Sequence, residues 1–309
     1  MKLYMREKES YPIGTRLNQM FFQSALPWLM PIGLVLLFVY FYPVFEIVRL
    51  SFTDATLIDD NHIYTLDSYR NLLSNPNFFQ MLMTTCIFVF FSILFQMLLG
   101  FIVAIVIDQG QKRGLKGTVI TRTAVLTAWA IPGVVIGVIW KILYNETDAG
   151  IINYLLNTVG IETIPFLSDP QMALFAVIFA NIWRGTAFSM ILIYAGLKTL
   201  PTDVIEAAKI DGANAFQRAI KVILPMLAPM LLINLVIISI DTFNTFDMVM
   251  ALTGGGPGQS TEVISLSIYS TIFNQFNLGQ GAATSVILLG INVLMTIVYI
   301  LFLGKGGNK

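Results

Sequence analysis

Six long apolar runs constrain this chain more than any other feature. Their approximate limits are 27–48, 81–107, 123–144, 172–197, 227–252 and 282–303. A helix rises about 1.5 Å per residue, so about 20 apolar residues cross a hydrocarbon core about 30 Å thick. The chain is 56% hydrophobic and only 12% charged, with a mean hydropathy of +0.76. The sequence therefore predicts an all-α integral membrane protein, with six transmembrane helices in a single domain at 27–303.

The distribution of basic residues predicts how these runs are oriented. Most of the 18 Lys and Arg residues share one predicted side of the membrane: Lys2, Arg6, Lys8, Arg16, Lys112, Arg113, Lys116, Arg122, Lys198, Lys209, Arg218, Lys221, Lys305 and Lys309. Loops rich in Lys and Arg remain in the cytoplasm. We therefore expect the segments 1–26 and 304–309, and both termini with them, to be cytoplasmic. A formal net charge of +0 gives no reason to expect a nucleic-acid partner.

A polar segment at 199–225 separates the fourth and fifth apolar runs. Pro201 suits the first turn of a helix, and Gly212 can take the left-handed conformation that ends one. Asn214 followed by Gln217 has the spacing of a capping box for a second helix. The apolar residues of this second helix recur at helical spacing: Phe216, Ile220, Ile223, Leu224 and Leu227. The pattern predicts a hairpin of two short helices, joined at a sharp bend and lying on the cytoplasmic membrane surface.

This hairpin resembles the coupling motif of ABC importer permeases. That motif is Glu-Ala-Ala, three residues, Gly, nine residues, Ile, one residue and Leu-Pro. Here the matching positions are Glu206, Ala207, Ala208, Gly212, Val222, Leu224 and Pro225, with Asp211 directly before the glycine. Val222 replaces the preferred Ile, which removes one methylene group. The resemblance implies that the hairpin docks on a cytoplasmic ATPase, whereas a surface hairpin without a partner is the simpler alternative.

Further stretches resemble the larger permease subunit of carbohydrate importers of the maltose, multiple-sugar and glycerol-phosphate types. They are Ser51-Phe52-Thr53-Asp54, Tyr69-Arg70-Asn71-Leu72, Trp129-Ala130-Ile131-Pro132, Asn181-Ile182-Trp183-Arg184-Gly185, Phe243-Asn244-Thr245-Phe246-Asp247 and Leu252-Thr253-Gly254-Gly255-Gly256-Pro257-Gly258. The resemblance covers nearly the whole chain. It implies a multi-pass protein of a bacterial or archaeal cytoplasmic membrane that imports a sugar or oligosaccharide, or alternatively a phosphorylated or acidic carbohydrate.

The resemblance also implies partners. They are a second, homologous permease subunit, two cytoplasmic ATPase subunits and an extracytoplasmic solute-binding protein. ATP and Mg²⁺ would be bound by the ATPases, and this chain would bind no cofactor or metal of its own. With a single histidine, His62, and a single cysteine, Cys86, the chain has no evident catalytic group, so we expect a transport subunit rather than an enzyme.

Matching the maltose-type permease position by position implies a sugar site at the middle of the membrane. Its residues here would be Trp129, Gly133, Asn181, Arg184, Gly185, Phe188, Asp241 and Thr242. An ionisable side chain at a helix centre costs about 2.5–3.5 kcal/mol on insertion scales, so it usually faces a cavity or a partner. Arg184 and Asp241 could therefore bind sugar hydroxyls, or they could simply neutralise each other, and the two roles are compatible. Gly133 could shape the site or allow close helix packing with Gly137.

An ion-coupled secondary transporter is the main rival from another functional class. Such a protein would need an inverted repeat or a carboxylate pair for ion coupling. The sequence has neither feature, and this alternative leaves the hairpin at 199–225 unexplained.

Overall fold

The computed structural model describes residues 26–59, 62–147 and 150–303. Within these ranges the chain consists of helices joined by turns and loops, and the extended contacts are two isolated β-bridges. The all-α prediction is confirmed for the residues described. The predicted terminal segments, 1–26 and 304–309, lie outside the described residues except for Leu26.

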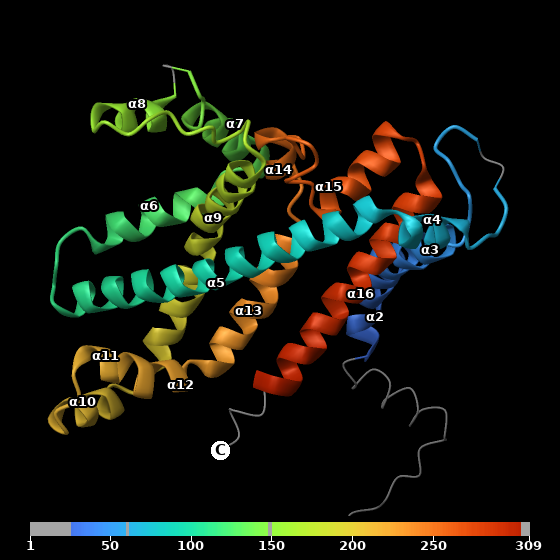
Figure 1. Ribbon diagram of the computed structural model, residues 1–309. Coiled ribbons are helices and arrows are strands. Elements are labelled where there is room, and N and C mark those ends of the chain that lie inside the picture. Colours follow the sequence, from blue (N-terminus) through green and yellow to red (C-terminus); the bar gives the residue numbers. More distant parts are fainter. Residues whose placement is uncertain (1–25, 60–61, 148–149, 304–309) are drawn as a thin grey trace, which may run out of the picture.

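Four helical segments are long and apolar enough to cross a membrane. They are Pro27–Leu50, α5 (Pro76–Lys112), α9 (Pro170–Thr199) and Leu278–Leu301 within α16 (Leu278–Leu303). The first comprises α2 (Leu26–Leu36), the π-helical segment η1 (Leu37–Phe41) and α3 (Tyr42–Leu50). Figure 1 shows α5 running across the molecule, with α9 and α13 (Ala228–Phe243) passing it at an angle.

The third apolar run is not one straight helix. It forms α6 (Thr118–Ala130) and α7 (Gly133–Leu143), whose axes differ by 102°. The residue before a proline is driven towards extended backbone, and Ile131 accordingly has φ −74° and ψ 131°. Pro132 also lacks an N–H group to continue the hydrogen-bond ladder. The expected span at 123–144 is therefore a broken pair of helices.

The fifth apolar run is also interrupted. After the short α12 (Leu224–Met226), α13 has 16 residues and covers about 24 Å, less than the hydrocarbon core of about 30 Å. It ends at Phe243, and α14 (Asp247–Leu252) follows after three residues. The helices at 215–226 and α13 meet at 76°. By length and composition the described residues hold four spans, or up to six if each bent pair counts as one, so the six-span count stays a prediction.

Shorter helices gather at the two ends of the long ones (Figure 1). They are α4 (Asp67–Ser74), α8 (Ile151–Thr158), α10 (Thr202–Ile210), α11 (Ala215–Arg218), the π-helical η2 (Ala219–Ile223), α15 (Ile264–Tyr269) and the π-helical η3 (Ser270–Asn274). In this view α7, α8, α14 and α15 lie towards one end of the molecule. The helices α10, α11 and α12 lie towards the other end.

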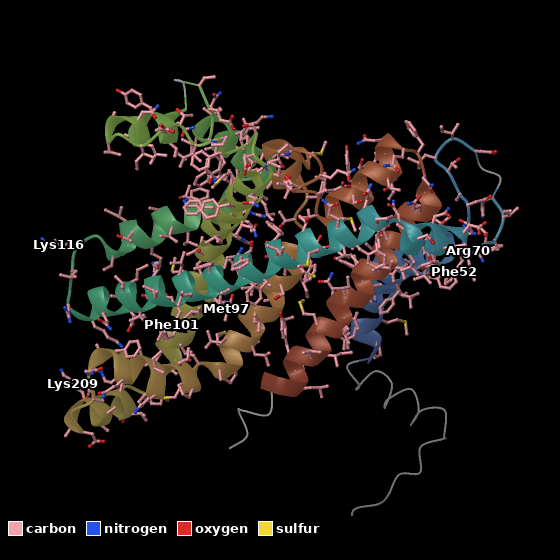
Figure 2. All side chains as sticks on the ribbon, in the orientation of Figure 1. Phe52, Arg70, Met97, Phe101, Lys116 and Lys209 are labelled. Carbon is pink, nitrogen blue, oxygen red and sulfur yellow. The ribbon has the colours of Figure 1, made fainter. Side chains whose placement is uncertain are left out.

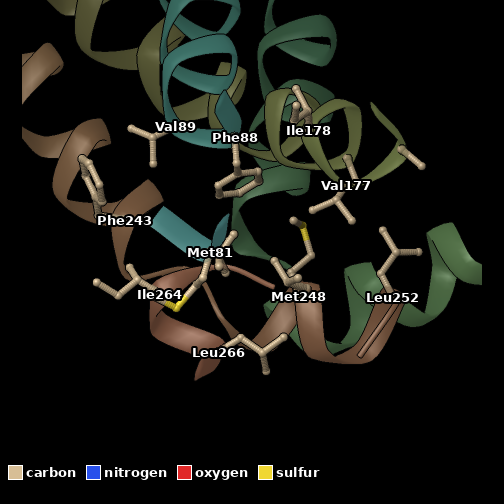
Figure 3. Packing of buried hydrophobic residues seen from close by; sticks show 14 of the residues in the cluster. Met81, Phe88, Val89, Val177, Ile178, Phe243, Met248, Leu252, Ile264 and Leu266 are labelled. Carbon is tan, nitrogen blue, oxygen red and sulfur yellow. The ribbon is translucent and has the colours of Figure 1, made fainter. Parts of the chain in front are cut away.

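The main hydrophobic core lies where α5, α7, α9, α14 and α15 meet (Figure 3). Phe88, Val177, Met248 and Ile264 are fully buried there. The closest helix pair is α5 with α9, and Gly100 permits it, because a Cβ at that position would lie 2.5 Å from the Cβ of Ser189. This core holds the two short helices α7 and α14 against the long pair.

A second, smaller core lies on the same α5–α9 pair, nearer to α10. It contains Ile107, Met190, Ile193, Leu197 and Leu227, all buried. The first span contrasts with both cores, since none of its most apolar 18-residue window is buried within this chain. Its contacts with the rest of the fold are made by α3 on α16.

The loop between α8 and α9 is held by one carboxylate. Glu146 accepts hydrogen bonds from the N–H groups of Leu167 and Ser168, each at 2.8 Å, and from the Ser168 hydroxyl at 2.7 Å. Burial alone raises the pKa of Glu146, but these hydrogen bonds favour the carboxylate and leave its pKa below the ordinary value. The loop is therefore expected to tighten as Glu146 ionises.

Candidate functional site

The hairpin has the geometry expected from its sequence. Gly212 has φ +80° with open space around it, so only the backbone conformation requires glycine there. The N–H of Gln217 donates to Oδ1 of Asn214 at 2.8 Å, and the N–H of Asn214 donates to Oε1 of Gln217 at 2.9 Å. The capping box is confirmed. The bend therefore depends on three residues that lie within six positions of one another.

The outer surface of the hairpin carries two large apolar side chains. Ile210, at the end of α10, is 86% exposed, and Phe216, in α11, is 75% exposed. Phe216 belongs to the predicted apolar stripe, of which only Leu227 is fully buried within this chain. The residues that the structure describes therefore leave most of the Phe216 side chain uncovered. An exposed apolar pair of this kind is typical of a surface that another protein covers.

Most of the predicted motif residues are exposed. Those that are exposed are Glu206, Ala207, Asp211, Gly212 and Pro225, whereas Ala208 and Leu224 are half-buried. Figure 2 places Lys209 of the hairpin and Lys116 of the α5–α6 loop towards one end of α5, and Arg70 towards the other end. The hairpin therefore shares an end of the molecule with other basic residues.

Two pairs among the predicted sugar-site residues are in contact. The rings of Trp129 in α6 and Phe188 in α9 lie 5.6 Å apart, tilted by 37°. Arg184 Nη1 in α9 lies 3.9 Å from Asp241 Oδ2 in α13, at the outer limit of an ion pair. The Arg184 side chain is 18% exposed and that of Asp241 is 54% exposed. The carboxylate is therefore open to whatever lies beside α13.

Unpaired polar atoms lie beside these pairs. In the part of the chain that the structure describes, Nδ2 of Asn181 and Nε of Arg184 are buried without a hydrogen-bond partner. Leaving a buried donor unpaired costs about 1–3 kcal/mol. The two donors lie three residues apart in α9, so they share one side of that helix. Such donors are available to a polar ligand or to another chain.

A residue that sequence reasoning missed supports this stretch of α9. Gln96 in α5 is 2% exposed, and its Nε2 donates to the backbone carbonyl of Asn181 at 3.1 Å. A Cβ at Gly185 would lie 2.3 Å from the Gln96 side chain, so glycine is needed there for close approach. The sequence contained a signal for this role, because Gln96 is a polar residue within a long apolar run, where a polar group without a hydrogen-bond partner is costly.

Gly133 and Thr242 belong to neither of the two residue pairs. Gly133 begins α7, and a Cβ there would lie 2.2 Å from the Asp247 carboxylate of α14. A Cβ at Gly137 would lie 2.6 Å from the carbonyl oxygen of Met248. Both glycines thus allow close packing of α7 on α14. Thr242 is buried at 2% exposure, one residue beyond Asp241 on α13, and no contact joins it to the other site residues.

The predicted sugar-site residues do not line the large groove found in the described part of the chain. A groove of about 810 Å³ lies between α13, α15, η3 and α16, and its walls include Asn244, Phe246, Tyr269, Phe273 and Asn292. Phe246, Tyr269 and Phe273 form an aromatic row, in which the first two rings are stacked at 5.4 Å and the last two are tilted at 4.9 Å. The residues predicted to bind sugar lie outside its walls. The structure brings some of these residues together in pairs without enclosing them.

The sequence as a whole matches a known family. The profile described as "Binding-protein-dependent transport system inner membrane component" covers residues 20–303. The trehalose/maltose transport system permease protein MalF of Thermococcus litoralis is 35% identical over 250 residues, which are 80% of this chain and 82% of the relative. The sn-glycerol-3-phosphate transport system permease protein UgpA of Brucella abortus is 31% identical over 269 residues, or 86% of this chain and 89% of the relative.

The fold matches solved structures too. A chain of a bacterial ABC transporter involved in the import of the acidic polysaccharide alginate superposes with a TM-score of 0.80. Its sequence identity is 19%, and the match covers 94% of this chain and 99% of that chain. The same TM-score is found with a structure of a bacterial alginate ABC transporter in complex with its pentasaccharide-bound periplasmic protein. At such low identity the likeness concerns the fold.

Proposed function

The chain belongs to the family of binding-protein-dependent transport system inner membrane components, and we propose that it imports a sugar or oligosaccharide as the permease subunit of an ABC transporter. The hairpin is the observation that carries this proposal. Its motif, its bend at Gly212 and its exposed apolar pair together form a surface suited to an ATPase groove. ATP hydrolysis would take place on the partner subunits, which also bind Mg²⁺, and this chain would have no ATPase site of its own.

The hairpin would transmit the motion of the ATPase to the transmembrane helices. Ile210 and Phe216 would enter an apolar groove of the ATPase, and Glu206 and Asp211 would pair with its basic residues. Burying one large apolar side chain is worth about 1.5–3 kcal/mol, so the two together can hold the hairpin in place. The remaining motif residues, Ala207, Ala208, Gly212, Leu224 and Pro225, would set the shape of the docked surface.

The cargo would pass between this subunit and a second, homologous permease. The first span supports a partner subunit, because none of its most apolar 18-residue window is buried within this chain. The unpaired donors of Asn181 and Arg184 support a polar cargo, and the Trp129–Phe188 pair offers an aromatic surface for a sugar ring. Gly133, Gly185 and Thr242 would shape the site from within, and Asp241 would accept hydrogen bonds from hydroxyl groups.

A negatively charged carbohydrate is the second candidate cargo. It is favoured by Arg184, a half-buried cation whose pairing with Asp241 is long at 3.9 Å, and by the relative named for sn-glycerol-3-phosphate. An incoming phosphate or carboxylate could replace the weakly held Asp241. Neutral sugars are favoured by the trehalose/maltose relative, which has the higher identity.

Orientation follows from the charge distribution. The basic residues around the hairpin and the α5–α6 loop support a cytoplasmic position for that end. Both termini would lie on this side, with α4, α8, α14 and α15 on the outer side, where a solute-binding protein delivers the cargo. The protein would be a multi-pass protein of a bacterial or archaeal cytoplasmic membrane.

The test is to purify the solute-binding protein encoded with this permease and to identify its bound molecule by mass spectrometry. The complete complex is then reconstituted in proteoliposomes, and uptake of that molecule is measured with and without ATP. We expect a neutral saccharide and ATP-dependent uptake. A phosphorylated or acidic saccharide would support the second candidate, and ATP-independent uptake would contradict the importer assignment.

A further inference from the structure

Asp108 is a buried carboxylate near the start of the hairpin, and it is not part of the proposed sugar site. Asp108 lies in the last turn of α5, and its side chain is only 7% exposed. Its two oxygens contact two different cations. Oδ1 lies 2.7 Å from Nζ of Lys198, and Oδ2 lies 2.8 Å from Nζ of Lys112. Charge-assisted hydrogen bonds of this length are among the stronger polar contacts in proteins.

The two lysines have different positions in the fold. Lys112 lies on α5 itself, four residues after Asp108, so this pair stays within one helix. Lys198 lies in the last turn of α9, which ends at Thr199, and α10 of the hairpin begins at Thr202. The contact between Asp108 and Lys198 therefore connects α5 to the last turn before the hairpin.

A tyrosine extends this contact to a third helix. The Tyr194 hydroxyl, one turn before Lys198 on α9, donates to Oε1 of Gln111 on α5. Nζ of Lys198 lies 4.9 Å from the centroid of the Tyr194 ring, and the guanidinium of Arg122 on α6 lies 5.6 Å from it. Cations at these distances over an aromatic ring are attracted to it. The end of α9 is thus fixed to both α5 and α6.

The other end of the hairpin is packed against the same turn. A Cβ at Gly196 would lie 2.9 Å from Cδ2 of Leu227 and 3.1 Å from Cγ of Met230. Leu227 is 2% exposed and directly precedes α13. The helices that enter and leave the hairpin therefore pack together at the membrane end of the hairpin. A displacement of the hairpin acts on both of them, and Asp108 provides a charged link through which it reaches α5.

We propose that Asp108 is a positioning residue for coupling, which transmits movement of the hairpin through Lys198 to α5. The proposal rests on the proposed function, since it assumes that an ATPase moves the hairpin. Each carboxylate oxygen of Asp108 contacts a lysine, and burial prevents the side chain from turning towards water. The link between α5 and α9 is therefore rigid. Gln96, which supports the Asn181–Gly185 stretch, also lies on α5. A shift of α5 would therefore reach the proposed sugar site directly.

Lys112 provides a matched control for this proposal. If Asp108 only needs a neutralising cation, Lys112→Met and Lys198→Met should have similar effects, because both lysines contact the same carboxylate at nearly the same distance. If the link between helices matters, only Lys198→Met should impair coupling. Lys198→Arg keeps the charge and the donors, so it should retain coupling, whereas Asp108→Asn should behave like Lys198→Met.

The readout is the ATPase activity of the complete complex in nanodiscs, measured with and without the solute-binding protein in its natively loaded form. We expect Lys198→Met and Asp108→Asn to assemble and to keep basal hydrolysis. Stimulation of hydrolysis by the binding protein should fall by about fivefold or more, because coupling between two sites typically amounts to at least about fivefold. Lys112→Met should stay within about twofold of wild type, because this pair lies within α5 and Asp108 keeps Lys198 as its cation.

The double variant Asp108→Asn with Lys198→Met separates coupling from simple charge balance. It leaves no buried charge unpaired, because the remaining cation, Lys112, is 49% exposed. A role in charge balance alone therefore predicts recovered stimulation, whereas the coupling role predicts that stimulation stays low. Recovery in the double variant, or equal losses in Lys112→Met and Lys198→Met, would overturn the proposal while leaving the importer assignment intact. A wild-type complex that the binding protein does not stimulate would instead overturn the proposed function, and this proposal with it.

Discussion

The hairpin and the proposed sugar site differ in how they are built. The bend of the hairpin depends on Gly212, Asn214 and Gln217, which lie within six positions, and each takes the conformation that its chemistry favours. The sugar site draws on α6, α9 and α13, and its parts meet only in pairs. A local motif forms within one chain. A site assembled from distant helices depends on packing, and here buried donors of Asn181 and Arg184 lack a hydrogen-bond partner among the described residues.

The largest effect is expected at the bend of the hairpin. Gly212→Pro should abolish ATP-driven uptake, because proline cannot adopt φ +80° and a misplaced proline costs about 3 kcal/mol or more. The loss should be specific to this position. Gly160→Pro is the matched control, since Gly160 has φ +82° and equally open surroundings but lies beyond α8, outside the hairpin. Equal uptake by the Gly212→Pro variant and wild type would contradict the docking role.

The next effect concerns Arg184 and Asp241. Asp241 is 54% exposed, so an ion pair there is worth only about 0–1 kcal/mol. The variants Arg184→Met and Asp241→Leu should therefore assemble and hydrolyse ATP, but each should lose uptake if the residues bind cargo. Uptake and ATPase activity are measured at matched expression. Wild-type uptake by the double variant would show that the two residues serve only to neutralise each other.

A smaller effect is expected where α5 supports the site. Gly185→Ala places a methyl group against the Gln96 side chain, and overpacking of this kind costs about 1–3 kcal/mol. Thermal stability of the purified complex should fall, and Gln96→Ala in the same chain should restore part of it. Additive losses in the double variant would indicate that the two side chains are not in contact.

The smallest effect concerns the loop that Glu146 holds, far from the hairpin. The pKa of Glu146 is lowered in the folded protein. Its contribution to the stability of the loop is therefore fully present above the ordinary carboxyl pKa of about 4.3, and it is lost as the pH falls through the lower, folded value. The protection of the Leu167 and Ser168 amides against hydrogen exchange, relative to the intrinsic exchange rate at each pH, should accordingly fall in acid. The variant Glu146→Gln should remove this pH dependence, and unchanged protection in wild-type protein at low pH would exclude the role.

The same comparison explains how much could be predicted from sequence. The hairpin bend and the all-α membrane class follow from residue chemistry and apolar length. The break at Ile131-Pro132 had a signal in the proline, but the angle of 102° depends on how α7 packs on α14. The exposure of Phe216 and the pairing of Asp108 with Lys198, 90 residues away, depend on tertiary structure. Periodicity within one helix carries no information about either.

Photocrosslinking from the hairpin tests the central claim most directly. A benzoyl-phenylalanine introduced at Phe216 is compared with one at Tyr154, which is 60% exposed on α8 at the opposite end of the molecule. In the assembled complex, irradiation should link position 216 to an ATPase subunit and should not link position 154 to it. Failure of position 216 to reach the ATPase, or a link from position 154, would contradict the assignment of the hairpin as the docking element.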